Sequence, residues 1–202
     1  MAFSYFFRDI DVLTNAVDKL IENLPAEGPI SIWDAGCAYG QEPFSLAILM
    51  AERMDEASFQ RVRILATDID ISDRFSQFIG SGVFPTAELQ RIPSELFRRY
   101  FLPTDNENAC KLKCDIRNSV NYKRDDLLKL TPPAGKFHLI VCKNVLMHFQ
   151  PTERNAVFAM FTESLHDSGL LAMGQAQDYE GVDLAAVQRI SPLLFLKRER
   201  VD

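Results

Sequence analysis

The chain has 202 residues, of which 47% are hydrophobic and 25% are charged, so it can bury a core of its own and we expect a single domain over residues 1–202. The net charge of −6 argues against nucleic acid or an acidic membrane surface as the main partner. No apolar run reaches the roughly 18 residues of a membrane span, and the N-terminus lacks the basic start and cleavage site of a signal peptide. These features predict a cytoplasmic protein without membrane insertion.

The first half of the chain alternates between helical and strand patterns. Apolar residues recur at helical spacing over 11–23, which predicts an amphipathic helix that covers one face of a sheet. The further elements predicted up to residue 101 are a strand at Ile30–Ala35, a helix at 43–55, a strand at 62–67, a short helix capped by Ser72, and a helix that starts at Ser94.

The pattern changes between residues 102 and 124. Residues 109–115 and 119–123 alternate around a turn, as the strands of a hairpin do, and they predict a small inserted β-subdomain. The elements predicted after it are a central parallel strand at Phe137–Cys142, a helix at 152–165, a strand at 170–173 and a closing antiparallel pair within 188–197. Such alternation predicts an α/β fold with a mostly parallel sheet and helices on both faces.

A glycine-bearing loop follows the first predicted strand and suggests a ligand. Gly36 and Gly40 allow a sharp turn and a close approach of the backbone, and Pro43 suits the first turn of a helix. Glu42 lies at the end of this loop, where it would repel a phosphate. The glycine spacing also lacks the third glycine of a dinucleotide site and the lysine of a P-loop. A cationic adenosyl ligand such as S-adenosylmethionine fits better; another nucleotide-binding fold and an ordinary strand–turn–helix unit are the alternatives.

Ligands of parallel sheets bind at the carboxyl ends of the strands, so the residues that follow each strand are candidates. Asp68 ends the second strand and could accept hydrogen bonds from both ribose hydroxyls; a solvated turn carboxylate is the alternative. Asp126 could contact an adenine or merely cap the next turn. The four cysteines are too few and too scattered for a disulfide framework, and no metal site is predicted.

Four motifs occur in order along the chain: FFRD at 6–9, DAGCAYGQEPFSLA at 34–47, ATDID at 66–70 and VCKNVLMHF at 141–149. Together with residues 81–101 they resemble the CheR-type chemoreceptor glutamate methyltransferases over nearly the whole chain. The resemblance implies a Rossmann-like class I methyltransferase fold, with a mostly parallel seven-stranded sheet, an antiparallel closing strand and a small β-subdomain at 102–124. It also implies S-adenosylmethionine as cofactor and S-adenosylhomocysteine as product.

The resemblance further implies roles for individual residues. Ser4 and Arg8 would touch the methionine end of the cofactor, and Glu42 would face its amino group or sulfonium. Asp68 would hold the ribose, while Asp126 and Leu127 would lie along the adenine. The full set implied to bind the cofactor is Ser4, Arg8, Gly36, Gly40, Glu42, Asp68, Asp126, Leu127, Asn144 and Val145, where Asn144 and Val145 follow a family Arg-Asn dipeptide whose arginine is Lys143 here.

The implied reaction is methyl transfer to glutamate carboxylates of a chemoreceptor or a similar helical partner. A glutamate is already ionised at neutral pH, so no general base is needed, and catalysis would come from orientation, with Arg8 placing the acceptor carboxylate. His148 replaces a family tyrosine and is expected to be either a substrate-facing donor or a buried, hydrogen-bonded side chain; His138 and His166 are expected to be structural or exposed.

Other departures concern the substrate side. A family GHSE segment reads Gly-Gln-Ala-Gln at 174–177, and the helical domain that normally precedes FFRD is expected to be absent. Two alternatives therefore stay open: a methyltransferase acting on another acceptor, and a cofactor-binding regulatory module without catalysis.

Overall fold

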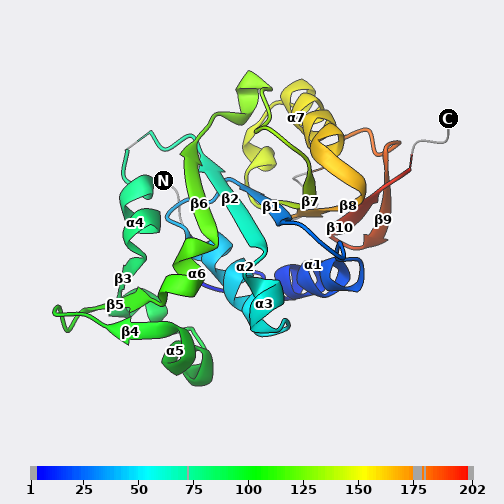
Figure 1. Cartoon of the computed structure of the whole chain (residues 1–202). Helices are drawn as coiled ribbons and strands as arrows, with labels where there is room; N and C mark the ends of the chain where they lie inside the picture. Colours follow the sequence, from blue (N-terminus) through cyan, green and yellow to red (C-terminus); the bar gives the residue numbers. More distant parts are fainter. Residues whose placement is uncertain (1–3, 72, 175–178, 180, 200–202) are drawn as a thin grey trace.

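The computed structural model describes residues 4–71, 73–174, 179 and 181–199. Its main feature is a seven-stranded sheet with the strand order β6-β2-β1-β7-β8-β10-β9 (Figure 1). The strands are β1 (Ile30–Ala35), β2 (Val62–Asp68), β6 (Val120–Arg124), β7 (Phe137–Cys142), β8 (Leu165–Met173), β9 (Val187–Ser191) and β10 (Leu194–Lys197). The strands from β6 to β8 run parallel, and β10 lies antiparallel to both β8 and β9.

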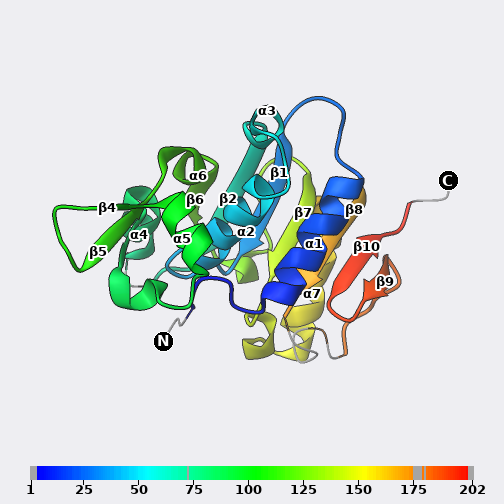
Figure 2. The same cartoon turned by 90° about the horizontal axis from the view of Figure 1, so that it is seen from below.

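Helices cover both faces of this sheet (Figures 1 and 2). The helices α1 (Ile10–Glu22) and α2 (Gln41–Ala51) pack on one face, and α7 (Pro151–Ser164) packs on the other. The strand β1 is buried on both sides: Ile30 and Ile32 belong to the core under α1 and α2, while Trp33 and Ala35 belong to the core under α7. This alternation follows from the two-residue period of a strand, and it places Asp34 on the α2 face.

A second, three-stranded antiparallel sheet has the order β3-β5-β4 and lies beside the main sheet (Figure 2). Its strands are β3 (Val83–Pro85), β4 (Phe101–Pro103) and β5 (Ala109–Leu112). The remaining helical elements are α3 (Glu56–Phe59), α4 (Phe75–Ser81), η1 (Thr86–Leu89), α5 (Ser94–Tyr100), α6 (Cys114–Asn118), η2 (Leu127–Lys129) and η3 (Leu146–His148).

The hairpin predicted from 109–115 and 119–123 is wrong. The strand β5 pairs with β3 and β4, whereas β6 joins the main sheet in parallel with β2, with Val120 opposite Ile64. Between them, α6 occupies the predicted turn and buries Ile116 completely. Alternation of apolar and polar residues with a period of two indicates a strand, but it does not show which other strand it pairs with. The pairing predicted from this pattern was therefore wrong.

Most other elements match their predictions. The strands β1 and β7 have the predicted bounds, and β9 and β10 form the predicted closing pair. The helix α2 begins at Gln41, two residues before Pro43, with Gly40 as its N-cap. Ser72, the predicted cap of the short helix at α4, lies outside the described residues. No helix within the described ranges is long and apolar enough to cross a bilayer.

Candidate cofactor site

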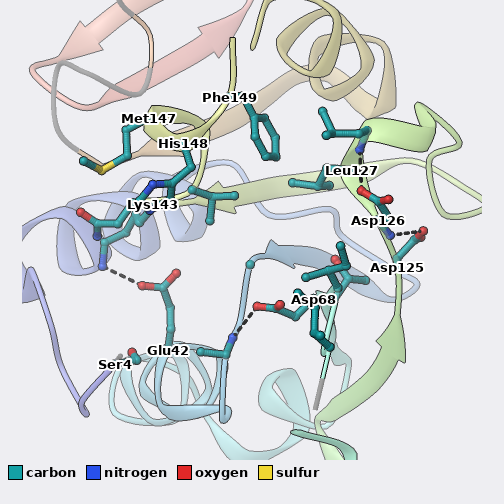
Figure 3. Close-up of a pocket in the computed structure, with 18 of the residues that line it drawn as sticks. Ser4, Glu42, Asp68, Asp125, Asp126, Leu127, Lys143, Met147, His148 and Phe149 are labelled. Carbon is teal, nitrogen blue, oxygen red and sulfur yellow. Dashed lines mark hydrogen bonds and ion pairs between the residues drawn. The ribbon is translucent and has the colours of Figure 1, made fainter. Parts of the chain in front are cut away.

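A cavity of about 780 Å³ opens at the carboxyl ends of β1, β2, β6 and β7 (Figure 3). This is the edge of a parallel sheet at which ligands bind, and the volume suits a small-molecule ligand. The cavity is lined by Ser4, Arg8, Gly36, Ala38, Glu42, Thr67, Asp68, Ile69, Ile71, Asp125, Asp126, Leu127, Leu128, Lys143, Asn144, Val145, Met147, His148 and Phe149.

The loop from β1 to α2 forms one wall of the cavity. Gly36 has a φ of 103° and donates its N–H to the Thr67 carbonyl at 2.7 Å, which ties the loop to β2. An added Cβ at Gly36 would come within 2.2 Å of Val145 Cγ2. Gly40 has a different position: it caps α2, and its ideal Cβ would meet Ile79 Cγ1 at 2.7 Å. The loop therefore needs glycine at both places, and Gly36 is the one that lines the cavity.

Replacing Gly36 with alanine is expected to destabilise the protein and weaken ligand binding at this wall. Its Cβ would displace Val145, and such overpacking costs about 1–3 kcal/mol beyond backbone strain. Gly135→Ala is the matched control, since Gly135 has a φ of 94° and open space around its ideal Cβ. Urea unfolding of both variants measures the difference, and equal losses of stability would contradict the role of the Val145 contact.

Asp68 ends β2 and faces the cavity across from the glycine loop (Figure 3). Its Oδ2 accepts from the Ala38 N–H at 2.9 Å and its Oδ1 accepts from the Asp70 N–H at 3.3 Å. A carboxylate has about four acceptor positions, so the two backbone amides orient Asp68 and leave acceptor capacity toward the cavity.

Glu42 lies in the first turn of α2, and its side chain pairs with Lys143, which follows β7 (Figure 3). The Lys143 ammonium is 2.8 Å from Glu42 Oε2 and 3.6 Å from Asp9 Oδ2, and it also donates to the Arg8 carbonyl at 2.8 Å. The Lys143 side chain is 0% exposed. The sequence placed both residues at this edge of the sheet but did not predict that they form an ion pair. The available signal was Lys143 itself, which stands where the related family has an arginine.

Asp34, near the end of β1, is a further acidic group that sequence reasoning did not single out. It is completely buried, and neither side-chain oxygen accepts a hydrogen bond from the residues that the structure describes. Burial, and then the negative charge of Glu42, raise the pKa of Asp34 well above its ordinary value, with Lys143 opposing this effect.

The segment 4–9 crosses from the small sheet to the cavity. Phe6 is 1% exposed and packs edge-to-face on Phe84 and Phe101, with ring centroids 4.9 and 5.5 Å away. The Phe7 N–H donates to Ser45 Oγ of α2 at 2.9 Å. Aromatic packing and this hydrogen bond thus fix the segment from two sides, and they bring Arg8 to the cavity wall.

The other residues singled out from the sequence have different positions in the structure. Leu127, Asn144, Val145 and Ser4 line the cavity. Asp126 also lines it, but its Oδ1 accepts from the Leu128 N–H at 3.0 Å, so the turn-capping alternative is present in the structure. His148 is exposed at the cavity, which excludes the buried alternative.

His138 is structural: its Nδ1 accepts from the Ser31 N–H at 3.1 Å. Residues 175–177 lie outside the described residues.

The fold defines the class of protein. The structure is similar to the N-methyltransferase NodS from Bradyrhizobium japonicum, with a TM-score of 0.51 and 13% identity, covering 95% of this chain and 97% of that one. It is also similar to a TehB-like SAM-dependent methyltransferase from Corynebacterium glutamicum, with a TM-score of 0.50, 13% identity and coverage of 92% and 85%. The fold is that of the class I S-adenosylmethionine-dependent methyltransferases.

The family follows from the sequence comparisons. A family model described as "CheR methyltransferase, SAM binding domain" matches residues 2–188. The chemotaxis protein methyltransferase of Vibrio parahaemolyticus is 30% identical over 194 residues, which cover 95% of this chain and 70% of that protein. That of Borreliella burgdorferi is 31% identical over 186 residues, covering 88% and 65%. The chain belongs to the CheR methyltransferase family, and its cofactor is S-adenosylmethionine.

The residues around the cavity suit this cofactor. S-adenosylmethionine carries a positive sulfonium and an ammonium, and the cavity offers Glu42 and Asp68 as oriented acceptors. Lys143 is engaged by Glu42 and Asp9, so it does not make the cavity basic. Apolar side chains such as Leu127 and Val145 supply the surface that an adenine ring requires.

Proposed function

We propose that this protein is a protein-glutamate O-methyltransferase that converts glutamate side chains of a chemoreceptor-like helical protein to methyl esters in the cytoplasm. The similarity to proteins named chemotaxis methyltransferases supports the acceptor. The observation that carries the proposal is the position of Arg8. Its side chain lines the same cavity as Glu42 and Asp68 and is 28% exposed, with Nε 3.8 Å from Asp9 Oδ2, whereas the other strongly basic side chain of the described wall, Lys143, is fully buried.

Methyl transfer requires the protein mainly to bind the cofactor and to orient the acceptor carboxylate. Bound S-adenosylmethionine supplies an electrophilic methyl group on its sulfonium sulfur. A glutamate carboxylate is ionised at neutral pH and attacks without a general base. An arginine can hold a carboxylate through two parallel hydrogen bonds, so Arg8 would aim the acceptor oxygen. Well-aligned systems gain about 7–11 kcal/mol from orientation alone.

Methyl-labelled S-adenosylmethionine and cytoplasmic fragments of chemoreceptors test this proposal. We expect label on the fragment, released as methanol by mild base, and no label on a matched fragment whose acceptor glutamates are replaced by alanine. Arg8→Gln should lower kcat/KM for the fragment about tenfold or more, since a hydrogen bond between charged groups is lost.

Two results would contradict the proposed acceptor. Label on a small carboxylate or on another protein, with none on receptor fragments, would keep the methyltransferase and change its substrate. Stable cofactor binding with no transfer to any acceptor would indicate a regulatory module instead.

A further inference from the structure

The buried carboxyl of Asp34 lacks the partners that an ionised group requires. It lies on the face of β1 that α2 covers, with 0% of the residue exposed. Neither Oδ1 nor Oδ2 accepts a hydrogen bond from any described donor. A buried carboxylate without donors is very unfavourable, and such a group takes up a proton instead.

The charged and titratable groups that face Asp34 come from four directions. They are Glu42 on α2, Lys143 after β7, Asp68 on β2 and Cys37 on the glycine loop. Cys37 is a buried thiol whose pKa is raised by burial and then by Asp34, and its Sγ donates to the Ala38 carbonyl at 3.6 Å. Two further carboxyl groups thus oppose the ionisation of Asp34, and one ammonium favours it.

Among the groups that act on Asp34, Glu42 is the one whose side chain is in hydrogen-bonding contact with it. Two carboxylates are both acceptors, so a hydrogen bond between them requires a proton on one of the two. Glu42 Oε2 accepts from the Lys143 ammonium at 2.8 Å, so Glu42 already serves as an acceptor. The proton is therefore assigned to Asp34, so that Glu42 accepts from both Asp34 and Lys143.

We propose that Asp34 is a positioning residue that acts in its protonated form: its carboxylic O–H donates to Glu42, and Lys143 holds the same carboxylate from the other side. Fixed by two donors, Glu42 presents an ionised oxygen to the cofactor's amino group. This inference concerns the cofactor end of the cavity and holds whichever side chain accepts the methyl group.

The first test is the pH dependence of unfolding for wild type and Asp34→Asn. The native protein keeps a proton that the unfolded chain loses above about pH 4, so wild-type stability falls as pH rises toward the raised pKa of Asp34. The asparagine has no such proton. Between about pH 4 and the raised pKa of Asp34, the wild-type unfolding constant should rise relative to that of the variant by up to about tenfold per pH unit.

Asp105→Asn is the matched control for this experiment, because Asp105 is an exposed loop carboxylate. Its unfolding curve should keep the wild-type pH dependence. Parallel curves for wild type and Asp34→Asn would show that Asp34 is ionised in the folded protein, and the proposal would fail.

The second test is cofactor affinity measured by calorimetry. The amide of Asp34→Asn can still donate to Glu42, so its Kd should stay within about threefold of wild type, whereas Asp34→Leu, of similar size and without a donor, should weaken binding about tenfold or more. Equal losses in both variants would mean that the negative charge of Asp34 attracts the cofactor directly, and would overturn the proposal.

The third test, infrared spectroscopy of the folded protein at neutral pH, does not require the leucine variant to fold. A buried protonated carboxylic acid gives a carbonyl band separate from those of carboxylates. We expect this band in wild type and Asp105→Asn and its loss in Asp34→Asn. Its absence from wild type would refute the protonated form, independently of whether receptor fragments are methylated.

Discussion

Replacing Lys143 with methionine is expected to destabilise the protein by about 3–5 kcal/mol, the range measured when one partner of a buried ion pair is removed. The Lys143 side chain is 0% exposed and that of Glu42 is 9% exposed, so water compensates only weakly for the lost ammonium. The same substitution also removes the donor to the Arg8 carbonyl, which loosens the segment that carries Arg8. Urea unfolding measures the loss.

The control for this prediction is Lys123→Met. Its ammonium lies 3.6 Å from Asp125 Oδ2, but its side chain is 58% exposed, so the loss should stay below about 1 kcal/mol. The double variant Glu42→Gln/Lys143→Met should recover part of the stability lost in Lys143→Met, because no buried charge is left unpaired. Equal effects of Lys143→Met and Lys123→Met would show that the buried pair contributes no more than a surface pair.

Asp68→Ala is expected to weaken binding of S-adenosylmethionine by about 1–3 kcal/mol, because it removes an acceptor that two backbone amides aim at the cavity. Calorimetric titration of the folded variant measures the change. Asp73→Ala is a suitable control, since Asp73 belongs to the same connection after β2 but its side chain is 76% exposed and paired with Arg124.

A cofactor analogue without ribose hydroxyls separates the two possible origins of this effect. If Asp68 binds the ribose, the analogue should bind wild type and Asp68→Ala about equally. If Asp68 acts by orienting the Ala38 amide and its loop, the analogue should lose affinity in the variant as well. An unchanged affinity for the natural cofactor would remove Asp68 from the site.

Elements whose apolar pattern is continuous could be read from the sequence directly. The strands β1 and β7 have their predicted bounds, because each is mainly apolar and buried on both faces, and because β1 is followed by Gly36 and β7 by Lys143. The residues at the ends of the parallel strands were predicted to meet at one edge, and the cavity wall contains Gly36 after β1, Asp68 at the end of β2 and Asn144 after β7. The parallel direction of neighbouring strands is enough to bring these residues together, because it places the carboxyl ends of the strands at the same edge of the sheet.

The pairing of the strands within 102–124 could not be read in the same way. The strand β6 alternates like a hairpin strand, yet it completes the edge of the main sheet beside β2. Its partner is decided by packing between segments more than fifty residues apart, as Val120 opposite Ile64 shows. Local alternation contains no information about such distant surfaces.

The alternating α/β order, the glycine loop and the acids at the strand ends follow from local sequence patterns and from chain connectivity. The pairing of Lys143 with Glu42 and the raised pKa of Asp34 arise from folding. Lys143 and Glu42 are 101 residues apart and become partners through burial, and Asp34 favours its proton because folding removes water and brings Glu42 beside it. Burial away from water and short distances between charged groups favour the Lys143–Glu42 pair and raise the pKa of Asp34. Both conditions arise only in the folded chain.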